Sequence, residues 1–121
     1  MNLNAYRAAS ITVGSHRVMV THGSTCYHPE TMTVNISSDI VFCHKLDSIL
    51  DALHECGHSQ QHRNHPVLFS MRNFWPVRLW LERDAWRKAH AYARILGFNK
   101  ALEGRKAVSH PSYWKPRIFV H

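Results

Sequence analysis

The chain has 121 residues, and 45% of them are hydrophobic, which is typical of one globular domain and excludes a disordered chain. No stretch approaches the roughly 18 consecutive apolar residues that a membrane span requires, and the N-terminus shows no basic segment followed by an apolar run. A formal net charge of +7 favours negatively charged partners, nucleic acid among them, without identifying one. We therefore expect a cytoplasmic protein, of the source or of a host cell, with no membrane partner.

Two β-strands are predicted in the first third of the chain. Residues 11–22 are rich in β-branched side chains and alternate in polarity towards their end, which indicates a strand after a short helix at residues 4–10. Residues 31–37 alternate between apolar and polar side chains, which indicates a second strand with one buried face. Gly23-Ser24 and Pro29-Glu30 are turn signals between the two strands.

The remainder of the chain predicts two long helices. Apolar residues recur at helical spacing over about residues 45–61, and a second helix is predicted over about 77–96, with Pro76 suited to its first turn. The segment between them should be mostly loop, and residues 99–121 should form a C-terminal tail that wraps over the domain. The order predicts a single α+β domain over residues 1–121, in which a small antiparallel sheet packs on both helices.

The run His54-Glu55-Cys56-Gly57-His58 lies inside the first long helix and predicts a metal site. Histidines four residues apart stand one turn apart on the same face of a helix, so both can bind one ion. A zinc hydrolase needs three protein ligands and a water molecule in the fourth position. Glu55 should point beside the ion, where it can take a proton from that water and pass it to the leaving amine. The alternative is a surface helix that carries histidines by chance in a histidine-rich chain.

Three residues are candidates for the third ligand: His62, Glu82 and Asp84. His62 continues the four-residue spacing, but eight helical residues rise about 12 Å, which is too far for His54 and His62 to bind one ion unless the helix breaks. Glu82 is a carboxylate on an otherwise apolar helix face, and a buried carboxylate needs a partner such as zinc. The alternative partner for Glu82 is Arg78, four residues earlier. Asp84 lies on the side that should face solvent.

This pair of motifs resembles the gluzincin metallopeptidases. His54-Glu55-Cys56-Gly57-His58 followed by Glu82-Arg83-Asp84-Ala85-Trp86 is similar to their His-Glu-x-x-His on one helix and Glu-x-x-Ala on the next. Residues 27–36 also resemble the edge strand along which small gluzincins of the ImmA/IrrE type lay an extended substrate. The resemblance covers about residues 20–96.

The resemblance implies one Zn²⁺ per chain, with His54, His58 and Glu82 as ligands and Glu55 as the general base. It also implies a protein or peptide substrate, and short stand-alone domains of this kind are typical of phage proteins. The sequence departs from the family at Trp86, where Asn or Asp is usual. The sequence does not select the group that stabilises the oxyanion or supports the ligands. The candidates for those roles are His62, His90, Tyr92, His110 and Tyr113.

Two other interpretations apply to residues outside these motifs. Cys26, Cys43 and Cys56 fit neither a disulfide framework nor a structural zinc site, because they are widely spaced, and they suit a reducing compartment. The aromatic and basic segment over residues 72–80 could contact nucleic acid through its rings and guanidinium groups. We therefore predict a zinc-dependent metallopeptidase, and the alternative is a basic, non-catalytic protein that binds nucleic acid or a host protein on the same fold.

Overall fold

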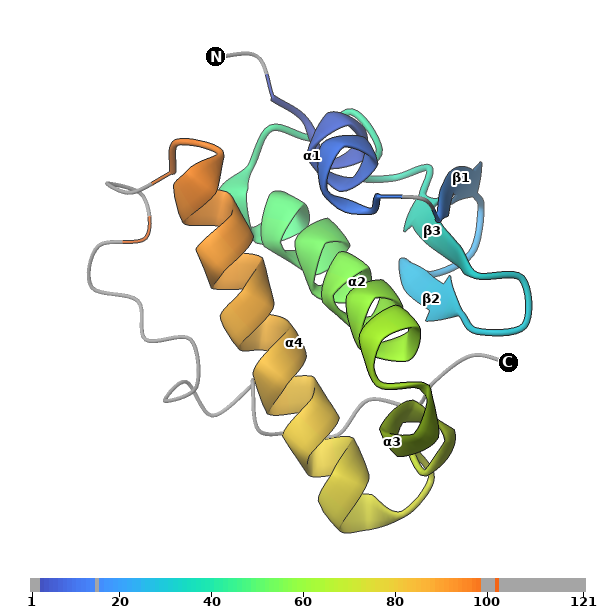
Figure 1. Cartoon of the computed structure of the whole chain (residues 1–121). Helices are drawn as coiled ribbons and strands as arrows, with labels where there is room; N and C mark the ends of the chain where they lie inside the picture. Colours follow the sequence, from blue (N-terminus) through green and yellow to red (C-terminus); the bar gives the residue numbers. More distant parts are fainter. Residues whose placement is uncertain (1–2, 15, 99–101, 103–121) are drawn as a thin grey trace.

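A computed structural model describes residues 3–14, 16–98 and 102, and within them it contains four helices and a three-stranded sheet (Figure 1). The predicted α+β class is confirmed. Except for Leu102, the predicted C-terminal tail over residues 99–121 lies outside the described residues. In chain order the elements are α1 (Ala5–Thr12), β1 (Arg17–Thr21), β2 (Cys26–His28), β3 (Thr33–Ser37), α2 (Leu46–Asn64), α3 (Pro66–Ser70) and α4 (Trp75–Ile95).

The sheet is mixed, with β3 between β1 and β2. β1 pairs with β3 in parallel, with Val18 opposite Val34 and Val20 opposite Ile36. β2 pairs with β3 antiparallel, with Tyr27 opposite Val34. The structure therefore corrects the antiparallel pairing expected for the two longer strands: the chain reverses direction twice between them, because β2 takes the antiparallel position beside β3. β2 has only three residues, too few for alternation to be recognised in the sequence.

The first strand is shorter than expected because α1 extends into the segment assigned to it. The helix begins after Asn4, whose side-chain oxygen accepts a hydrogen bond from the backbone N–H of Arg7 at 2.8 Å. Three buried alanines form its inner face, which packs against α2. The β-branched Ile11 lies in this helix, Gly14 follows it with a φ of 74°, and the strand starts only at Arg17.

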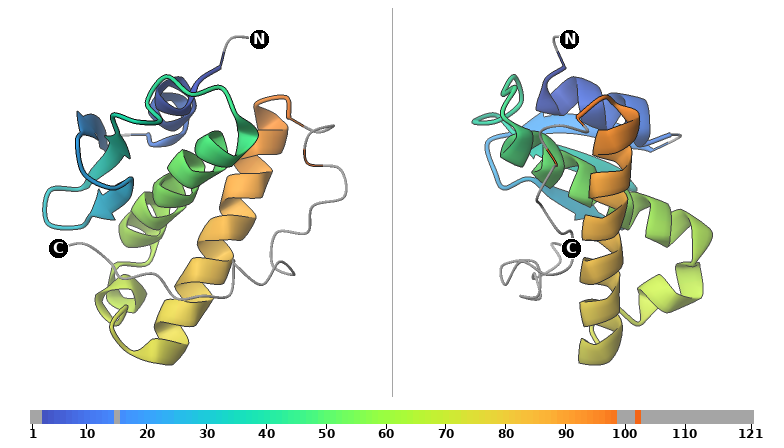
Figure 2. Two further views of the ribbon diagram at one scale, coloured as in Figure 1. Left: turned by 180° about the vertical axis from the view of Figure 1, so that it is seen from behind. Right: turned by 90° about the vertical axis from the view of Figure 1, so that its left-hand side faces the viewer.

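The two long helices match their predicted ranges within a few residues and pack against each other (Figure 1). Figure 2 shows that α2 lies in the middle, with the sheet and α1 on one side and α4 on the other. The short helix α3 occupies part of the expected loop between them. Because α2 is covered on both sides, its residues from Ala52 to Ser59 are all buried.

Buried apolar side chains form two clusters, and both include residues of α1, α2 and α4. The first cluster also contains the buried apolar residues of the sheet, and the second contains most of the apolar residues that α4 contributes, together with Leu102. Among the described helices, none combines the length and the apolar character that crossing a membrane requires.

Gly57 permits a close approach between α2 and α4. A Cβ atom at this position would lie 3.1 Å from both the Cα and the carbonyl oxygen of Ala85, and 3.3 Å from its Cβ. These contacts are tighter than ordinary van der Waals packing, so a side chain at position 57 would push the helices apart. The approach also brings His58, the next residue on α2, against Glu82 of α4.

We predict that Gly57→Val lowers the free energy of unfolding by about 2 kcal/mol, within the range of roughly 1–3 kcal/mol that is typical of overpacking. The higher helix propensity of valine offsets only a few tenths of a kcal/mol, roughly. Denaturant unfolding followed by circular dichroism measures the change. Arg87→Val, at an exposed position of α4, is the control and should shift stability by less than about 0.5 kcal/mol. Equal losses in the two variants would contradict the assigned role of Gly57.

Candidate metal centre

His54 and His58 lie one turn apart on α2, and both are buried, with 0% and 1% of their surface exposed. Their ring centroids are 4.6 Å apart. The helix places them in the interior because its middle is covered by the sheet and α1 on one side and by α4 on the other. This burial excludes the alternative of a surface helix that carries histidines by chance.

Helix α4 brings the carboxylate of Glu82 against both histidines. Its Oε1 lies 2.7 Å from Nε2 of His58, and its Oε2 lies 3.1 Å from Nε2 of His54. Glu82 is fully buried. Among the described residues its ion pairs are with these two histidines, so the alternative pair with Arg78 is not formed. One carboxylate from α4 therefore joins both histidines of α2.

The Nδ1 atoms of the two histidines, which face away from Glu82, also have hydrogen-bond partners. Nδ1 of His54 lies 3.0 Å from Oε2 of Glu55, and Nδ1 of His58 lies 2.9 Å from Oε1 of Gln61. The side-chain nitrogen of Gln61 donates to a backbone carbonyl of α4 at 2.9 Å and to the carboxylate of Asp84 at 2.8 Å. Since both N–H groups of this amide face oxygen atoms, its own oxygen must accept the hydrogen bond from His58.

These contacts determine which ring nitrogen carries the proton. When Nδ1–H of His58 donates to Gln61, Nε2 of the neutral ring carries a lone pair, and the same holds for His54 against Glu55. Both lone pairs then face the two oxygens of Glu82, which are also acceptors. Acceptors at this distance repel one another unless a cation lies among them. The site therefore requires a positive charge, either protons on the imidazoles or a metal ion.

The donor set fits a metal ion. His54, Glu55 and His58 are buried, offer ligand atoms within 4.8 Å of one another, and could hold an ion. Tetrahedral zinc, with bonds of roughly 2.0–2.1 Å, places its ligand atoms about 3.3 Å apart. The distances of 2.7 and 3.1 Å from Glu82 to the two histidines are somewhat shorter, so a small outward displacement of Glu82 would admit an ion. Glu55 contacts Nδ1 of His54, the ring nitrogen opposite the one that faces Glu82.

The pKa values of the group reflect the same charges. Burial disfavours the charged form of His54, but the charges and hydrogen bonds of Glu55 and Glu82 outweigh burial and raise its pKa to about 9. Burial also opposes ionisation of Glu82, yet the hydrogen bonds and charges of His54 and His58 hold the pKa of its carboxyl far below the usual range. Without metal, the group is thus an ion pair between a carboxylate and a protonated imidazole.

Two residues that the sequence did not assign to the site support it. The indole ring of Trp86 stacks on His54, with ring centroids 4.2 Å apart and an interplanar angle of 18°. Trp86 follows Glu82 by one turn, at the position where the gluzincins usually have Asn or Asp. Gln61 follows His58 by three residues on α2 and holds its ring, and this helical spacing is the signal that could have identified it.

His62 contacts residues other than His54, His58 and Glu82. Its Nδ1 lies 2.7 Å from the hydroxyl of Tyr27, and its ring stacks on Phe69 with centroids 4.9 Å apart. Phe69 in turn meets His58 edge-on, at 6.4 Å between centroids. His62 therefore lies one turn beyond His58 on α2, in contact with Tyr27 and Phe69.

The other candidates for oxyanion stabilisation lie away from Glu82 or outside the described residues. His90 is buried on α4, but it follows Glu82 by eight residues, which is about 12 Å along the helix. The hydroxyl of Tyr92, farther along α4, donates to the side chain of Gln60. His110 and Tyr113 fall outside the described part of the chain.

The three cysteines are free, as predicted. Cys56 is buried, and its thiol faces the backbone carbonyl of Ala9 on α1 at 3.7 Å, on the side of α2 away from α4. Cys26 and Cys43 are partly exposed. Within the described ranges, the group that could hold a metal ion is the one around His54, so the cysteines form no structural zinc site there.

Comparisons with models of protein families, with curated protein sequences and with solved structures find no match for this chain. The geometry of the site is therefore the observation from which its function is argued.

We predict that the metal-free protein loses stability as the pH rises from about 6.5 to about 9. The pKa of His54 is raised to about 9 in the folded state. Its stabilising contribution is therefore fully present below the unfolded value of about 6.5 and is lost as the pH rises through the folded value. This rise in the pKa of His54 corresponds to about 3 kcal/mol in the free energy of unfolding.

Thermal unfolding of chelator-treated, dialysed protein across this pH range measures the effect. Glu82→Gln removes one of the charges that raise the pKa and should flatten the profile. A wild-type profile that is already flat above pH 6.5 would rule out the ion pair.

Proposed function

We propose that the protein is a zinc-dependent metallopeptidase that hydrolyses a peptide bond in a protein or peptide substrate. The observation that carries this proposal is the convergence of two imidazole lone pairs and two carboxylate oxygens in a buried site that needs a cation. In the proposal His54, His58 and Glu82 hold one Zn²⁺, and Glu55 acts as the general base.

The donor chemistry favours zinc over other common ions. Two imidazoles and one carboxylate form a nitrogen-rich set, whereas Ca²⁺ and Mg²⁺ prefer oxygen ligands. Three protein ligands leave a fourth position of a tetrahedral ion for water, which is typical of a catalytic site. When bound, such an ion supplies the acidity that lowers the pKa of a coordinated water to about 7.

The ligands are held in the orientation that metal binding requires. The Nδ1 atoms of His54 and His58 face Glu55 and Gln61, so both rings present Nε2 towards Glu82. A hydrogen bond on the second ring nitrogen fixes the tautomer and increases the basicity of the ligand. The stacked ring of Trp86 restricts rotation of His54.

The position of Glu55 supports a role in proton transfer. It adjoins His54 on α2 and is almost fully buried, and its carboxylate belongs to the group within 4.8 Å. In the proposed reaction it accepts a proton from the attacking water and passes it to the leaving amine. Burial raises the pKa of Cys26 on strand β2, and the charge of Glu55 adds to that rise.

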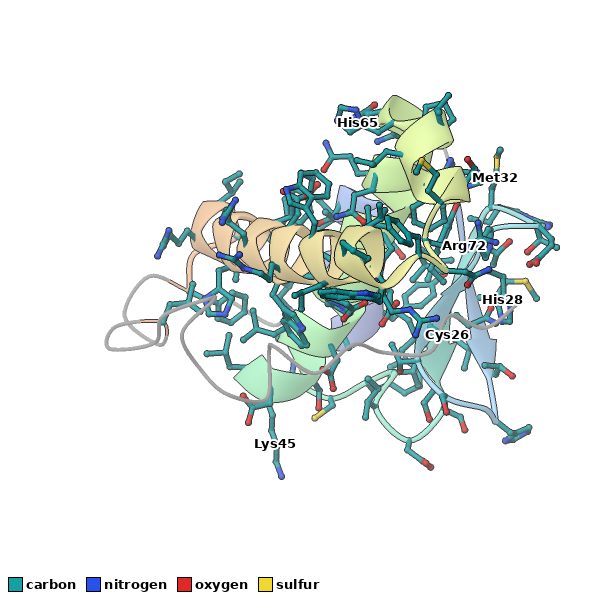
Figure 3. The ribbon with its side chains drawn as sticks, turned by 90° about the horizontal axis from the view of Figure 1, so that it is seen from below. Cys26, His28, Met32, Lys45, His65 and Arg72 are labelled. Atoms are coloured by element: carbon teal, nitrogen blue, oxygen red, sulfur yellow. The ribbon has the colours of Figure 1, made fainter. Side chains whose placement is uncertain are left out.

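Strand β2 is an edge of the sheet and packs beside α2. Its residues Cys26 and His28 are partly exposed, with the thiol 3.4 Å from the His28 ring (Figure 3). An edge strand can pair with an extended peptide through backbone hydrogen bonds. An extended substrate along β2 would bring a peptide bond to the side of α2 that carries Glu55.

We predict that the protein binds one Zn²⁺ per chain and that Glu82→Gln weakens zinc binding by at least about 100-fold. This loss should exceed the roughly 10–100-fold cost of removing a group that only supports a ligand. Competition with a chromophoric chelator measures the affinity, and elemental analysis measures the stoichiometry. Asp47→Asn, which removes an exposed carboxylate near the start of α2, should bind zinc as the wild type does. Equal affinities of Glu82→Gln and Asp47→Asn would reject Glu82 as a ligand.

We further predict that Glu55→Gln keeps its zinc but loses hydrolysis by about 10²–10⁴-fold, the usual contribution of a general base. Cleavage of denatured protein and of a mixed peptide library, followed by mass spectrometry, measures the activity. Cys43→Ala, remote from the site, is the control with unchanged activity. Full activity in Glu55→Gln would overturn its role. A zinc-loaded wild type that cleaves nothing would favour the alternative of a non-catalytic binding protein with net charge +7.

A further inference from the structure

A second group of histidines lines a pocket of about 570 Å³ at the end of α2. The pocket is formed where the residues before and at the start of β1, the β2–β3 loop and the junction of α2 and α3 meet. Figure 3 labels Met32 and His65, which mark the loop and the helix junction at this end of the molecule. The residues that line the pocket are His16, Arg17, Thr31, Met32, His62, Arg63 and Pro66.

The two histidine rings of this pocket are held in place. Nδ1 of His62 lies 2.7 Å from the hydroxyl of Tyr27, and Nδ1 of His16 is hydrogen-bonded to the hydroxyl of Ser59. The ring of His16 also stacks parallel to Tyr27, at 6.0 Å between centroids. In both histidines Nε2 has no hydrogen-bond partner among the described residues. When the hydroxyl group donates to Nδ1, Nε2 carries the ring N–H and is a donor.

The guanidinium group of Arg63 lies beside Gly14. Its Nη1 lies 2.6 Å from the position that a Cβ atom on residue 14 would occupy. Gly14 has a φ of 74°. This φ favours glycine, which has no Cβ atom. The C-terminal end of α2 attracts cations, which accounts for Arg63 and His62. It does not account for His16 and Arg17, which reach the same pocket from another part of the chain.

The residues that line the pocket include positively charged side chains but no acidic side chain. Arg17 is exposed and forms no ion pair within the described residues. Burial and the charges of Arg63 and His62 lower the pKa of His16. Burial and Arg72 lower the pKa of His62, and the exposed carboxylate of Glu30, which lies outside the lining, opposes that shift only in part. None of the residues that line the pocket is itself acidic, and Arg17 and Arg63 bring two guanidinium groups to it.

We propose that this pocket binds a phosphate group through Arg17, Arg63, His16 and His62. A phosphate monoester carries about −1.5 to −2 charges and presents several acceptor oxygens, which matches two guanidinium groups and two ring N–H donors better than the two oxygens of a carboxylate do. The volume of about 570 Å³ leaves room for the group to which the phosphate is attached. This site is separate from the proposed metal centre and does not depend on it.

The test is isothermal titration of the full chain with inorganic phosphate, after chelation and dialysis, at constant ionic strength. Removing metal beforehand ensures that phosphate cannot bind at a zinc ion. We expect saturable binding at one site. Arg17→Gln should weaken it by about tenfold or more, because it removes charge-assisted hydrogen bonds. Arg94→Gln, near the far end of α4, is the matched control and should bind as the wild type does.

A second variant and a second ligand complete the experiment. Arg63→Gln should also weaken phosphate binding by about tenfold, and circular dichroism checks that each variant is folded. No saturable binding in the wild type, or equal binding in Arg17→Gln, Arg63→Gln and Arg94→Gln, would overturn the proposal. A labelled single-stranded oligonucleotide that phosphate displaces identifies nucleic acid as the source of the phosphate group. Phosphate binding without oligonucleotide binding identifies a small phosphorylated ligand.

Discussion

The buried carboxylate of Glu82 between His54 and His58 is the interaction on which the rest of the structure depends. It joins the two long helices in the interior, where an uncompensated charge would be strongly destabilising. The glycine at position 57 makes the approach close enough, and Gln61 orients one ring by connecting it to α4. The contacts of Glu82 with the two histidines therefore both join α2 to α4 and define the geometry of the site.

The position of α2 in the middle of the fold explains why its polar residues are internal. A helix at the surface would leave its histidines hydrated, and their mutual contacts would contribute little. Here Glu55, His58 and Gln61 are all buried, so each must have a hydrogen-bond partner. The contacts among these side chains supply those partners, and they also orient Nε2 of both histidines towards one point.

Histidines in two parts of this small domain have pKa values that are shifted in opposite directions. At the candidate metal centre carboxylates surround His54 and raise its pKa to about 9. In the pocket at the end of α2, burial and arginine charges lower the pKa values of His62, on α2, and of His16, just before β1. The first environment suits a cation and the second suits an anion. Phe69 and Tyr27 lie between the proposed cation site and the proposed anion site.

Local spacing in the sequence was sufficient to predict both long helices, the shared face of His54 and His58, and Glu82 on an apolar face of the following helix, because helical periodicity depends only on neighbouring residues. Zinc binding by these residues stays a proposal. The sequence did not reveal the parallel pairing of β1 with β3, the extension of α1, or the roles of Gln61, Trp86 and His16. Only the tertiary structure decided these features, because each depends on contacts between residues far apart in the chain or on strands too short to show a period.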